Sequence, residues 1–175
     1  WNGHPPLPHT LASSDAVAPA ALATLREVWS GGADIPEALR ERFAEKFGVG
    51  VSATYGLSEA PTVVSIDPPE GTHVEGASGR PLPHLDVVVL DDDGEPGTPG
   101  GGGEICGRPA TAAGYPGLYR LPLGYWERPD ESEATFGGGT LRTGDVGVVD
   151  DGWLHIRDRK KLVILRGGAN VYPAE

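Results

Sequence analysis

The sequence predicts a mixed fold in which a helix-and-strand first part passes into an antiparallel, strand-rich second part. An amphipathic helical pattern in the first third is followed, after Gly48, by short apolar runs that turn residues separate. Two Asp-Gly turns, which are typical of β-hairpins, lie between runs of this kind. With 175 residues and 38% apolar content, the chain is long enough to bury a sizeable core.

Two helices are predicted in the first third. One runs from about Val17 to Trp29, with leucine and tryptophan at helical intervals, and stops at Gly31. The other follows Asp34, which can cap it, and has Pro36 in its first turn. Its predicted apolar face consists of Ile35, Leu39, Phe43 and Phe47. The residues expected to point to water are Glu37, Arg40, Glu41, Glu45 and Lys46.

The later apolar runs are predicted strands, at 49–54, 62–66, 85–90, 104–106, 145–149, 153–157 and 161–165. The turns at 91–94 and 150–152 should connect neighbouring strands. A calcium loop starting at Asp91 is not supported, because no glutamate stands at its twelfth position. The glycine-rich stretch 96–103 has no lysine for a phosphate cradle, so we interpret it as a connection.

Charge and composition exclude several classes of function. A net charge of −11 makes general binding to nucleic acid or anionic lipid unfavourable. Locally, five of the 14 basic residues fall within ten positions, 157–166, where they could serve a nucleotide phosphate or form a solvated strand face. No apolar run of 18 residues and no signal peptide is visible, which favours the cytoplasm. The one cysteine, Cys106, is expected to be a buried thiol rather than a catalytic one.

Four segments carry residues suited to nucleotide chemistry. Segment 30–33, Ser-Gly-Gly-Ala, would let the backbone approach a flat ligand, although a plain helix stop explains it too. Segment 54–59 offers an aromatic ring for stacking, a hydroxyl for phosphate and a carboxylate for magnesium; the alternative is a simple turn with an exposed glutamate. In segment 142–145, Asp145 could accept hydrogen bonds from a ribose diol or merely stabilise a turn. Charges at 158–161 and the glycines after Arg166 suit a hinge beside an anion.

The order of these segments resembles the adenylate-forming superfamily of acyl-CoA synthetases, peptide-synthetase adenylation domains and luciferases. The resemblance runs from about Gly3 to Glu175 and includes the tracts 55–59, 76–83, 124–129 and 143–145. The ending Gly-Gly-Ala-Asn-Val-Tyr-Pro-Ala-Glu resembles the acyl-CoA ligase branch. The resemblance implies the C-terminal part of a large domain, with a helix-strand subdomain at 1–75 and a distorted antiparallel β-barrel at 76–157. A hinge and the start of a small C-terminal domain would occupy 158–175.

The resemblance also implies the roles of individual residues. The ATP- or AMP-binding set would be Gly32, Ala33, Thr54, Tyr55, Gly56, Ser58, Glu59, Asp145, Ile156 and Arg159. Within this set Tyr55 would stack on adenine, and Asp145 with Arg159 would hold the ribose hydroxyls. Ser58 would contact the α-phosphate and Glu59 the magnesium, which makes these two the catalytic pair. Lys161 would be the hinge, and the acyl pocket would include Ala53, Thr54 and Leu57.

The implied activity is that of an AMP-forming acyl-CoA synthetase, which uses ATP, Mg²⁺ and CoA to activate a carboxylic acid. Alternatives are an adenylation domain or acyl-AMP ligase that loads a carrier protein, and a non-catalytic module that keeps the fold. The absence of methionine and the abrupt ends lead us to expect an internal fragment, inactive by itself, without the family's phosphate loop and adenylation lysine. Two departures from the family concern local loop shape: residues 111–123 are longer than expected, and His84 stands where glycine is common. Neither the acid nor the oligomeric state can be read from the sequence.

Overall fold

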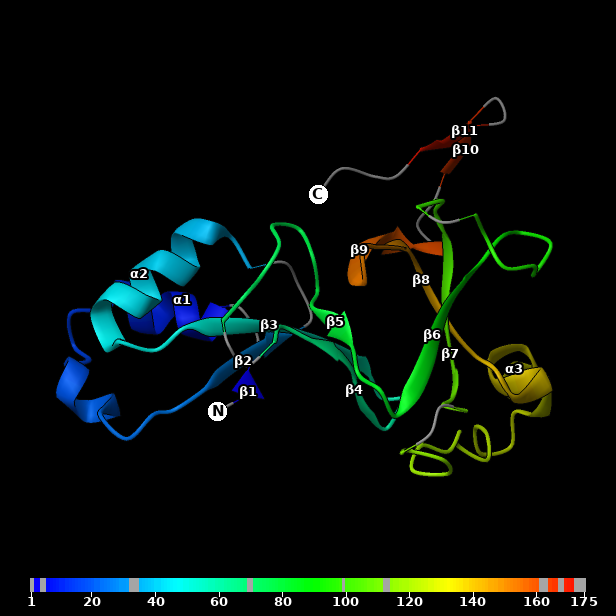
Figure 1. The fold of residues 1–175 in the computed structure, drawn as a ribbon, viewed down its shortest axis with the longest axis horizontal. Helices are drawn as coiled ribbons and strands as arrows, with labels where there is room; N and C mark the ends of the chain where they lie inside the picture. Colours follow the sequence, from blue (N-terminus) through cyan, green and yellow to red (C-terminus); the bar gives the residue numbers. More distant parts are fainter. Residues whose placement is uncertain are drawn as a thin grey trace.

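The computed structural model describes residues 2–3, 6–31, 35–68, 71–98, 100–111, 114–160, 164–166 and 169–171. It shows two lobes side by side along the long axis (Figure 1). The first lobe contains α1, α2 and the strands β1 to β5, and the second contains β6 to β9 and α3. The predicted passage from a mixed α/β part into an antiparallel part is therefore confirmed.

A five-stranded sheet in the order β1-β2-β3-β4-β5 forms the first lobe. Its strands are β1 (Asn2–Gly3), β2 (Val28–Gly31), β3 (Val51–Leu57), β4 (Thr62–Ile66) and β5 (Arg80–Pro81). The first three run parallel to one another, and β4 and β5 add antiparallel pairs. The carboxyl ends of β2 and β3 consequently lie at the same edge, where α/β sheets place their ligands.

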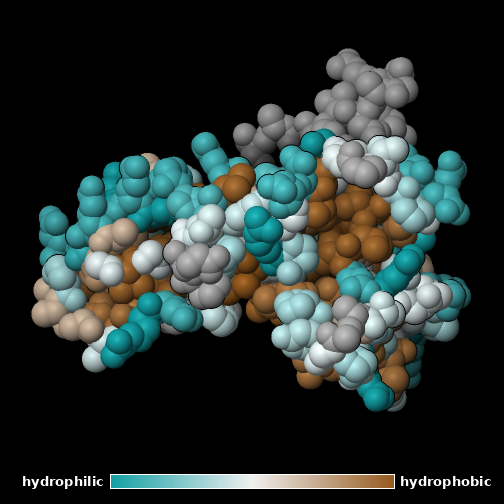
Figure 2. All heavy atoms as spheres, viewed as in Figure 1, coloured by the Kyte–Doolittle hydropathy of each residue, from teal (hydrophilic) through white to brown (hydrophobic). Residues whose placement is uncertain are grey.

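The predicted amphipathic helix is confirmed as α2 (Glu37–Phe47), which ends at Gly48 in the left-handed conformation at φ 70°. The predicted apolar face packs on the sheet with Val28 and Val51, and Phe43 is fully buried. In Figure 2 the outer surface of this lobe is hydrophilic over α2, as an amphipathic helix requires. The helix starts at Glu37, after Pro36 at the cap position, whereas Asp34, the predicted cap, lies outside the described residues.

Arg40 does not point to water as predicted. It is buried, and its Nη1 lies 2.8 Å from Oδ2 of Asp67, which follows β4. The same nitrogen donates to the backbone carbonyl of Val51, and the amide of Ala53 donates to Asp67 at 2.6 Å. An arginine on the buried side of a helix needs such a carboxylate and carbonyl to offset its desolvation.

The predicted helix from Val17 to Trp29 is wrong. Only a single 3₁₀ turn, η1 (Pro19–Leu22), forms there, and β2 begins at Val28. β2 pairs with β1 and β3 on its two sides. Burial alternates along it, with Val28 and Ser30 almost completely buried, because successive side chains of a strand point to opposite faces of the sheet. Pairing in the sheet therefore outweighs the helical spacing of the leucines.

A helix that was not predicted, α1 (Pro6–Ser13), packs against α2. Its sequence contains two prolines, which the first turn of a helix tolerates because its N–H groups have no partner within the helix. Lys46 of α2 donates to the carbonyls of Leu11 and Ser14, at the end of α1. This contact ties the two helices together above the sheet.

The second lobe is a four-stranded antiparallel sheet in the order β6-β7-β8-β9. Its strands are β6 (Leu85–Leu90), β7 (Gly103–Pro109), β8 (Leu141–Asp150) and β9 (Trp153–Arg159). Each of them contains a predicted strand, and Asp151-Gly152 forms the predicted tight turn between β8 and β9 with φ of 46° and 77°. At the other predicted turn, Oδ1 of Asp91 accepts hydrogen bonds from the amides of Asp93 and Glu95.

The remaining elements of the described residues are a helix, a 3₁₀ turn and a pair of short strands. The helix α3 (Pro129–Phe136), which was not predicted, contacts β8 and is followed by the 3₁₀ turn η2 (Gly137–Gly139). A two-stranded antiparallel sheet joins β10 (Ile164–Arg166) and β11 (Ala169–Val171) near the C-terminus. Only the end of the predicted strand 161–165 is described, as part of β10. No helix in the described part of the chain is both long and apolar enough to cross a membrane.

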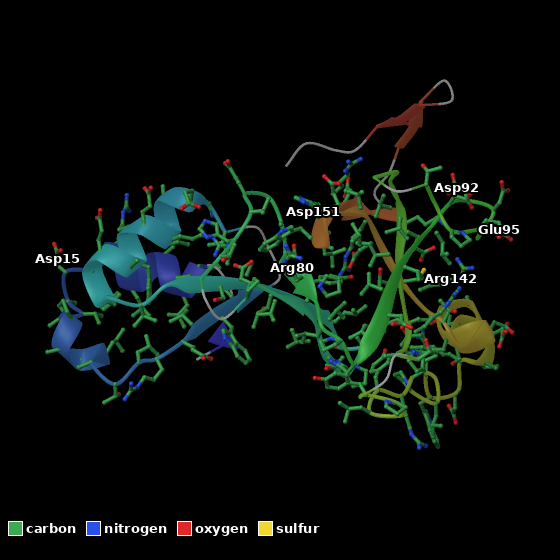
Figure 3. All side chains as sticks on the ribbon, viewed as in Figure 1. Asp15, Arg80, Asp92, Glu95, Arg142 and Asp151 are labelled. Atoms are coloured by element: carbon green, nitrogen blue, oxygen red, sulfur yellow. The ribbon has the colours of Figure 1, made fainter. Side chains whose placement is uncertain are left out.

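The segment around β5 joins the lobes. Its strand pairs with β4, while the amide of Ser78 donates to the carbonyl of Leu154 and the amide of Leu154 donates to Gly79. Gly79 has a φ of 89°, and a Cβ there would lie 2.2 Å from the backbone of Ile66, so only glycine fits. Arg80 stacks on Trp153 at 4.6 Å and lies beside the turn that carries Asp151 (Figure 3).

Candidate functional site

The candidate site begins at the carboxyl ends of β2 and β3, where two of the four predicted segments meet. Gly31 pairs with Thr54 across the parallel strands. A Cβ at Gly31 would lie 2.6 Å from Oγ1 of Thr54, so the absent side chain permits this close approach. Gly32 and Ala33, the predicted adenine contacts that follow, lie outside the described residues.

Directly after Thr54, β3 changes its register against β4 between Tyr55 and Gly56. Such a β-bulge bends the strand and re-aims its side chains, and bulges are common next to binding sites. Gly56 is exposed, and a Cβ on it would lie 3.0 Å from the carbonyl oxygen of Thr62. The bulge and the close packing against β4 thus set the direction in which the Tyr55 side chain leaves the sheet.

Tyr55 reaches across to the second lobe. Its hydroxyl donates to Oδ2 of Asp145 on β8 at 2.6 Å. The other oxygen of this carboxylate, Oδ1, lies 3.0 Å from Nε of Arg159, which stands opposite Asp145 on β9. Three predicted site residues, 90 and 14 positions apart in the chain, therefore form one connected group.

The environment of this group differs from one member to the next. Asp145 is 4% exposed, and its amide is bonded to Oγ1 of Thr143, which in turn donates to the carbonyl of Ile105. Burial, reinforced by the bond to Asp145, raises the pKa of Tyr55 far above its ordinary value, so its hydroxyl stays a donor well into the alkaline range. The side chain of Arg159, in contrast, is 71% exposed.

Glu104 on β7 supports the turn before Asp145, a role that the sequence reading missed. Its carboxylate is 7% exposed and accepts a hydrogen bond from the amide of Gly144 at 3.2 Å. It also lies 3.4 Å from Nη1 of Arg142 and 3.3 Å from Nζ of Lys160. In Figure 3, Arg142 lies in the second lobe on the side of the loop that carries Asp92 and Glu95. One feature of the sequence could have indicated this role: Glu104 is a charged residue at the start of the apolar run that forms β7, and buried charged residues need partners.

Glu59 and Ser58 lie on the turn between β3 and β4, where Ser58 is exposed and Glu59 half-buried. The hydroxyl of Tyr125 donates to Oε1 of Glu59 at 3.0 Å, so the tract at 124–129 meets the tract at 54–59. Burial, together with the bond to Glu59, raises the pKa of Tyr125. Within the described ranges, no three His, Cys, Asp or Glu side chains gather as a metal-binding group.

The remaining predicted site residues are placed as follows. Ala53 is buried in β3 and Leu57 is half-buried at its end. Ile156 is half-buried on β9, opposite Gly147. The predicted hinge, Lys161, lies outside the described residues, and β9 continues to Arg159.

The two departures from the family pattern lie at the boundary between the lobes. His84 shares a hydrogen bond of 2.9 Å with the hydroxyl of Thr62 on β4. In the long segment 111–123, Tyr119 is 4% exposed and packs with Ala60 and Leu141 in a core that both lobes share. Leu118 and Leu123 of the same segment are exposed. This segment thus combines one buried side chain, Tyr119, with the exposed side chains of Leu118 and Leu123.

Comparison with known proteins identifies the family that the chain resembles. A family model described as AMP-binding enzyme matches residues 1–115. The long-chain-fatty-acid CoA ligase of Salmonella typhimurium is 37% identical over 146 residues, covering 83% of this chain and 24% of the ligase. A feruloyl-CoA synthase of Amycolatopsis is 34% identical over 175 residues, covering 99% of this chain and 34% of the synthase.

The fold agrees as well. The O-succinylbenzoate coenzyme A synthetase of Bacillus subtilis, solved in complex with ATP and magnesium, matches with a TM-score of 0.80 and 28% identity, over 98% of this chain and 34% of that one. The chain therefore spans only 24% to 34% of the length of these proteins. The resemblance to adenylate-forming enzymes is confirmed, and the chain belongs to the family of AMP-binding enzymes.

Proposed function

We propose that this chain is part of an ATP-dependent acyl-CoA synthetase, in which it supplies the nucleoside-binding side of the active site. The observation that carries the proposal is the connected group of Tyr55, Asp145 and Arg159, because it brings an aromatic ring, a buried carboxylate and an exposed cation to one place. These are the chemical groups that adenine, a ribose diol and a nucleotide anion require.

The proposed reaction has two steps. A carboxylate oxygen of the acid attacks the α-phosphorus of ATP, the bond to the bridging oxygen breaks, and pyrophosphate leaves with its electron pair. The CoA thiolate then attacks the acyl carbon of the adenylate, and AMP leaves. Residues of this chain would position the nucleotide for both steps, which lowers the entropic part of the barrier.

On the nucleoside side, Tyr55 would stack on adenine beside the backbone of Thr54 and Gly56. Asp145 and Arg159 would bind the ribose hydroxyls, and Ile156 would touch the base. The positions of Tyr55 and Asp145 support this assignment, since a ring from β3 and a carboxylate from β8 converge although they come from different lobes. Gly32 and Ala33 keep the role that the resemblance implies, as adenine neighbours.

On the phosphate side, Ser58 would contact the α-phosphate and Glu59 would hold magnesium. The donor set fits, because magnesium in ATP sites commonly takes one or two carboxylates together with phosphate oxygens and water. Glu59 is half-buried beside Tyr125, which engages one of its two oxygens. When bound, the metal would offset charge on the transferring phosphoryl group.

The acid stays open within this proposal. Ala53, Thr54 and Leu57 would line part of the acyl pocket, at the end of β3. The similar relatives are named for a long-chain fatty acid and for ferulic acid at 37% and 34% identity, so identity does not separate an aliphatic from an aryl substrate.

Further features of the proposal come from the resemblance. Lys161 would be the hinge, and the division into 1–75, 76–157 and 158–175 stays a prediction. A cytoplasmic location, where ATP and CoA are both available, accompanies the proposed reaction.

The test is acid-dependent release of pyrophosphate by the enzyme that contains these residues, expressed with its natural flanking sequence. A panel of fatty, aryl and short acids would identify the substrate class. Adding CoA in one arm and a phosphopantetheinylated carrier protein in another would identify the acceptor. Thioester formation with CoA is the expected result; exclusive transfer to the carrier would indicate the carrier-loading alternative. Absence of release with every acid would contradict the proposal and favour a non-catalytic module.

A further inference from the structure

We propose that the Tyr55 hydroxyl positions the Asp145 carboxylate for recognition of the ribose hydroxyls, so that one tyrosine serves both the base and the sugar. This inference rests on the proposed function and deepens it. It assigns to the hydroxyl a role separate from that of the ring. The ring would supply a stacking face, which any aromatic side chain offers, whereas the hydroxyl would set the selectivity for a 2′,3′-diol.

The hydrogen-bonding capacity of Asp145 supports this role. A carboxylate can accept about four hydrogen bonds. Among the described residues, Tyr55 donates to Oδ2 at 2.6 Å and Arg159 pairs with Oδ1 at 3.0 Å. One further acceptor position then remains on each oxygen. A ribose diol has two hydroxyl donors, which matches that remaining capacity.

The two protein partners of Asp145 differ in how firmly they are held. Arg159 is 71% exposed at the end of β9, so its side chain has room to move aside and contact the sugar when the ribose hydroxyls replace it on the carboxylate. Tyr55 lies at a β-bulge and packs against the core formed by Ala60, Val64 and Leu141. Since the Asp145 side chain is only 5% exposed, a sugar can reach it only if one partner moves. The exposed arginine is the one that can move, and the tyrosine is the fixed reference.

The backbone of Asp145 is held from the opposite side. Thr143 Oγ1 is 3.1 Å from the Asp145 amide, and Glu104 accepts from the Gly144 amide at 3.2 Å. These bonds place the backbone but leave rotation about the side-chain bonds of Asp145. The bond from Tyr55 restricts that rotation, and it persists well above neutral pH because burial raises the pKa of the phenol.

The test compares Tyr55→Phe with Tyr119→Phe in the full enzyme. The first change removes the hydroxyl and keeps the ring. The second removes another buried hydroxyl that has no hydrogen-bond partner among the described residues, in the core that Tyr55 packs against. Tyr119→Phe therefore controls for the loss of a buried hydroxyl as such.

Adenylation is measured with ATP, 2′-deoxyATP and 3′-deoxyATP. For Tyr55→Phe we expect the preference for ATP over the deoxynucleotides to fall about tenfold, through a higher KM for ATP with kcat little changed. Tyr119→Phe should keep the preference of the unmodified enzyme. In an Asp145→Ala background, adding Tyr55→Phe should change the preference no further, because the partner of the hydroxyl is gone.

Three results would overturn the inference: an unchanged preference in Tyr55→Phe, equal KM increases for all three nucleotides, or additive effects of Tyr55→Phe and Asp145→Ala. Thermal melting of each variant separates these results from loss of fold. Calorimetric binding of AMP and of 2′-deoxyAMP to the same variants needs no acid and no turnover. It tests the inference even if the proposed ligase reaction fails in every acid.

Discussion

The two lobes contribute to the candidate site in different ways. The first lobe contributes backbone geometry: parallel strands that end together, a glycine against Thr54, and a bulge after Tyr55. The second lobe contributes two buried carboxylates, Asp145 and Glu104, which its antiparallel strands hold. A flat base requires close backbone approach, whereas a ribose diol requires fixed acceptors. The nucleoside side of the proposed site would therefore take its backbone geometry from one lobe and its buried carboxylate from the other.

The two hydrophobic cores differ in whether they lie within one lobe or between the lobes. One cluster, around Phe43 and Val51, lies entirely within the first lobe between α2 and the sheet. The other joins Ala60 and Val64 of the first lobe to Leu85 and Leu141 of the second. In Figure 2, hydrophobic atoms also gather over the four-stranded sheet, in contrast to the hydrophilic surface over α2. We therefore expect changes in the first core to affect mainly stability, and changes between the lobes to affect the site.

The largest effect on activity is expected from Glu59→Ala in the full enzyme. Loss of the proposed magnesium ligand should lower the adenylation rate by roughly two to four orders of magnitude. Rapid-quench measurement of adenylate formation checks this result. Glu45→Ala, at an exposed position on α2, is the matched control and should leave the rate unchanged. A normal rate in Glu59→Ala would remove Glu59 from the catalytic pair.

The largest effect on stability is expected from Arg40→Ala. It would leave the Asp67 carboxylate, whose side chain is 2% exposed, without its charge partner. Breaking a buried pair in this way typically lowers the free energy of unfolding by about 3 to 5 kcal/mol. Urea denaturation measures the loss, with the exposed Arg42→Ala on the same helix as control. If the two variants lose equal stability, the buried pair is not what holds α2 to β3.

Asp145→Ala is expected to have a smaller effect that falls on substrate affinity. Ribose contacts exist in the ground state as well as in the transition state, so the KM for ATP should rise by about tenfold or more while kcat changes less. Steady-state kinetics at varied ATP checks this pattern. A fall in kcat at constant KM would instead place Asp145 in the chemical step.

The smallest effect at neutral pH is expected from the titration of Cys106, which is 1% exposed in β7. Burial, with a contribution from the charge of Glu104, raises the pKa of its thiol from 9.0 to about 11. Because the folded state favours the protonated thiol, this contribution to stability is complete below pH 9 and is lost as the pH rises through 11. The contribution is on the order of 3 kcal/mol.

Urea denaturation of the unmodified protein and of Cys106→Ala, between pH 8 and 11, measures the contribution of the thiol to the free energy of unfolding. The stability difference between the two proteins should shrink across that range. A constant difference would show that the thiol does not titrate differently in the folded and unfolded states.

Much of the fold could be predicted, because local patterns carry it. The apolar face of α2 repeats with the helical period, and β4 and β6 were predicted with the bounds that the structure shows. The prediction of a helix at 17–29 was wrong because the spacing of apolar residues in this segment does not show that β2 pairs with β1 and β3 in the sheet. Arg40 was misplaced for a similar reason, since Asp67 lies 27 positions away.

By itself, the sequence determined the fold class and the family, and it selected Tyr55, Asp145 and Arg159 as candidate site residues, because periodicity, turn chemistry and motif order are local or ordered along the chain. Only the tertiary structure decided that Tyr55 bonds to Asp145 across the lobes, that Glu104 supports the turn before it, and that Tyr125 meets Glu59. These contacts join residues 40 to 90 positions apart. Their formation depends on strand pairing and on how the two lobes pack together, and no local pattern contains that information.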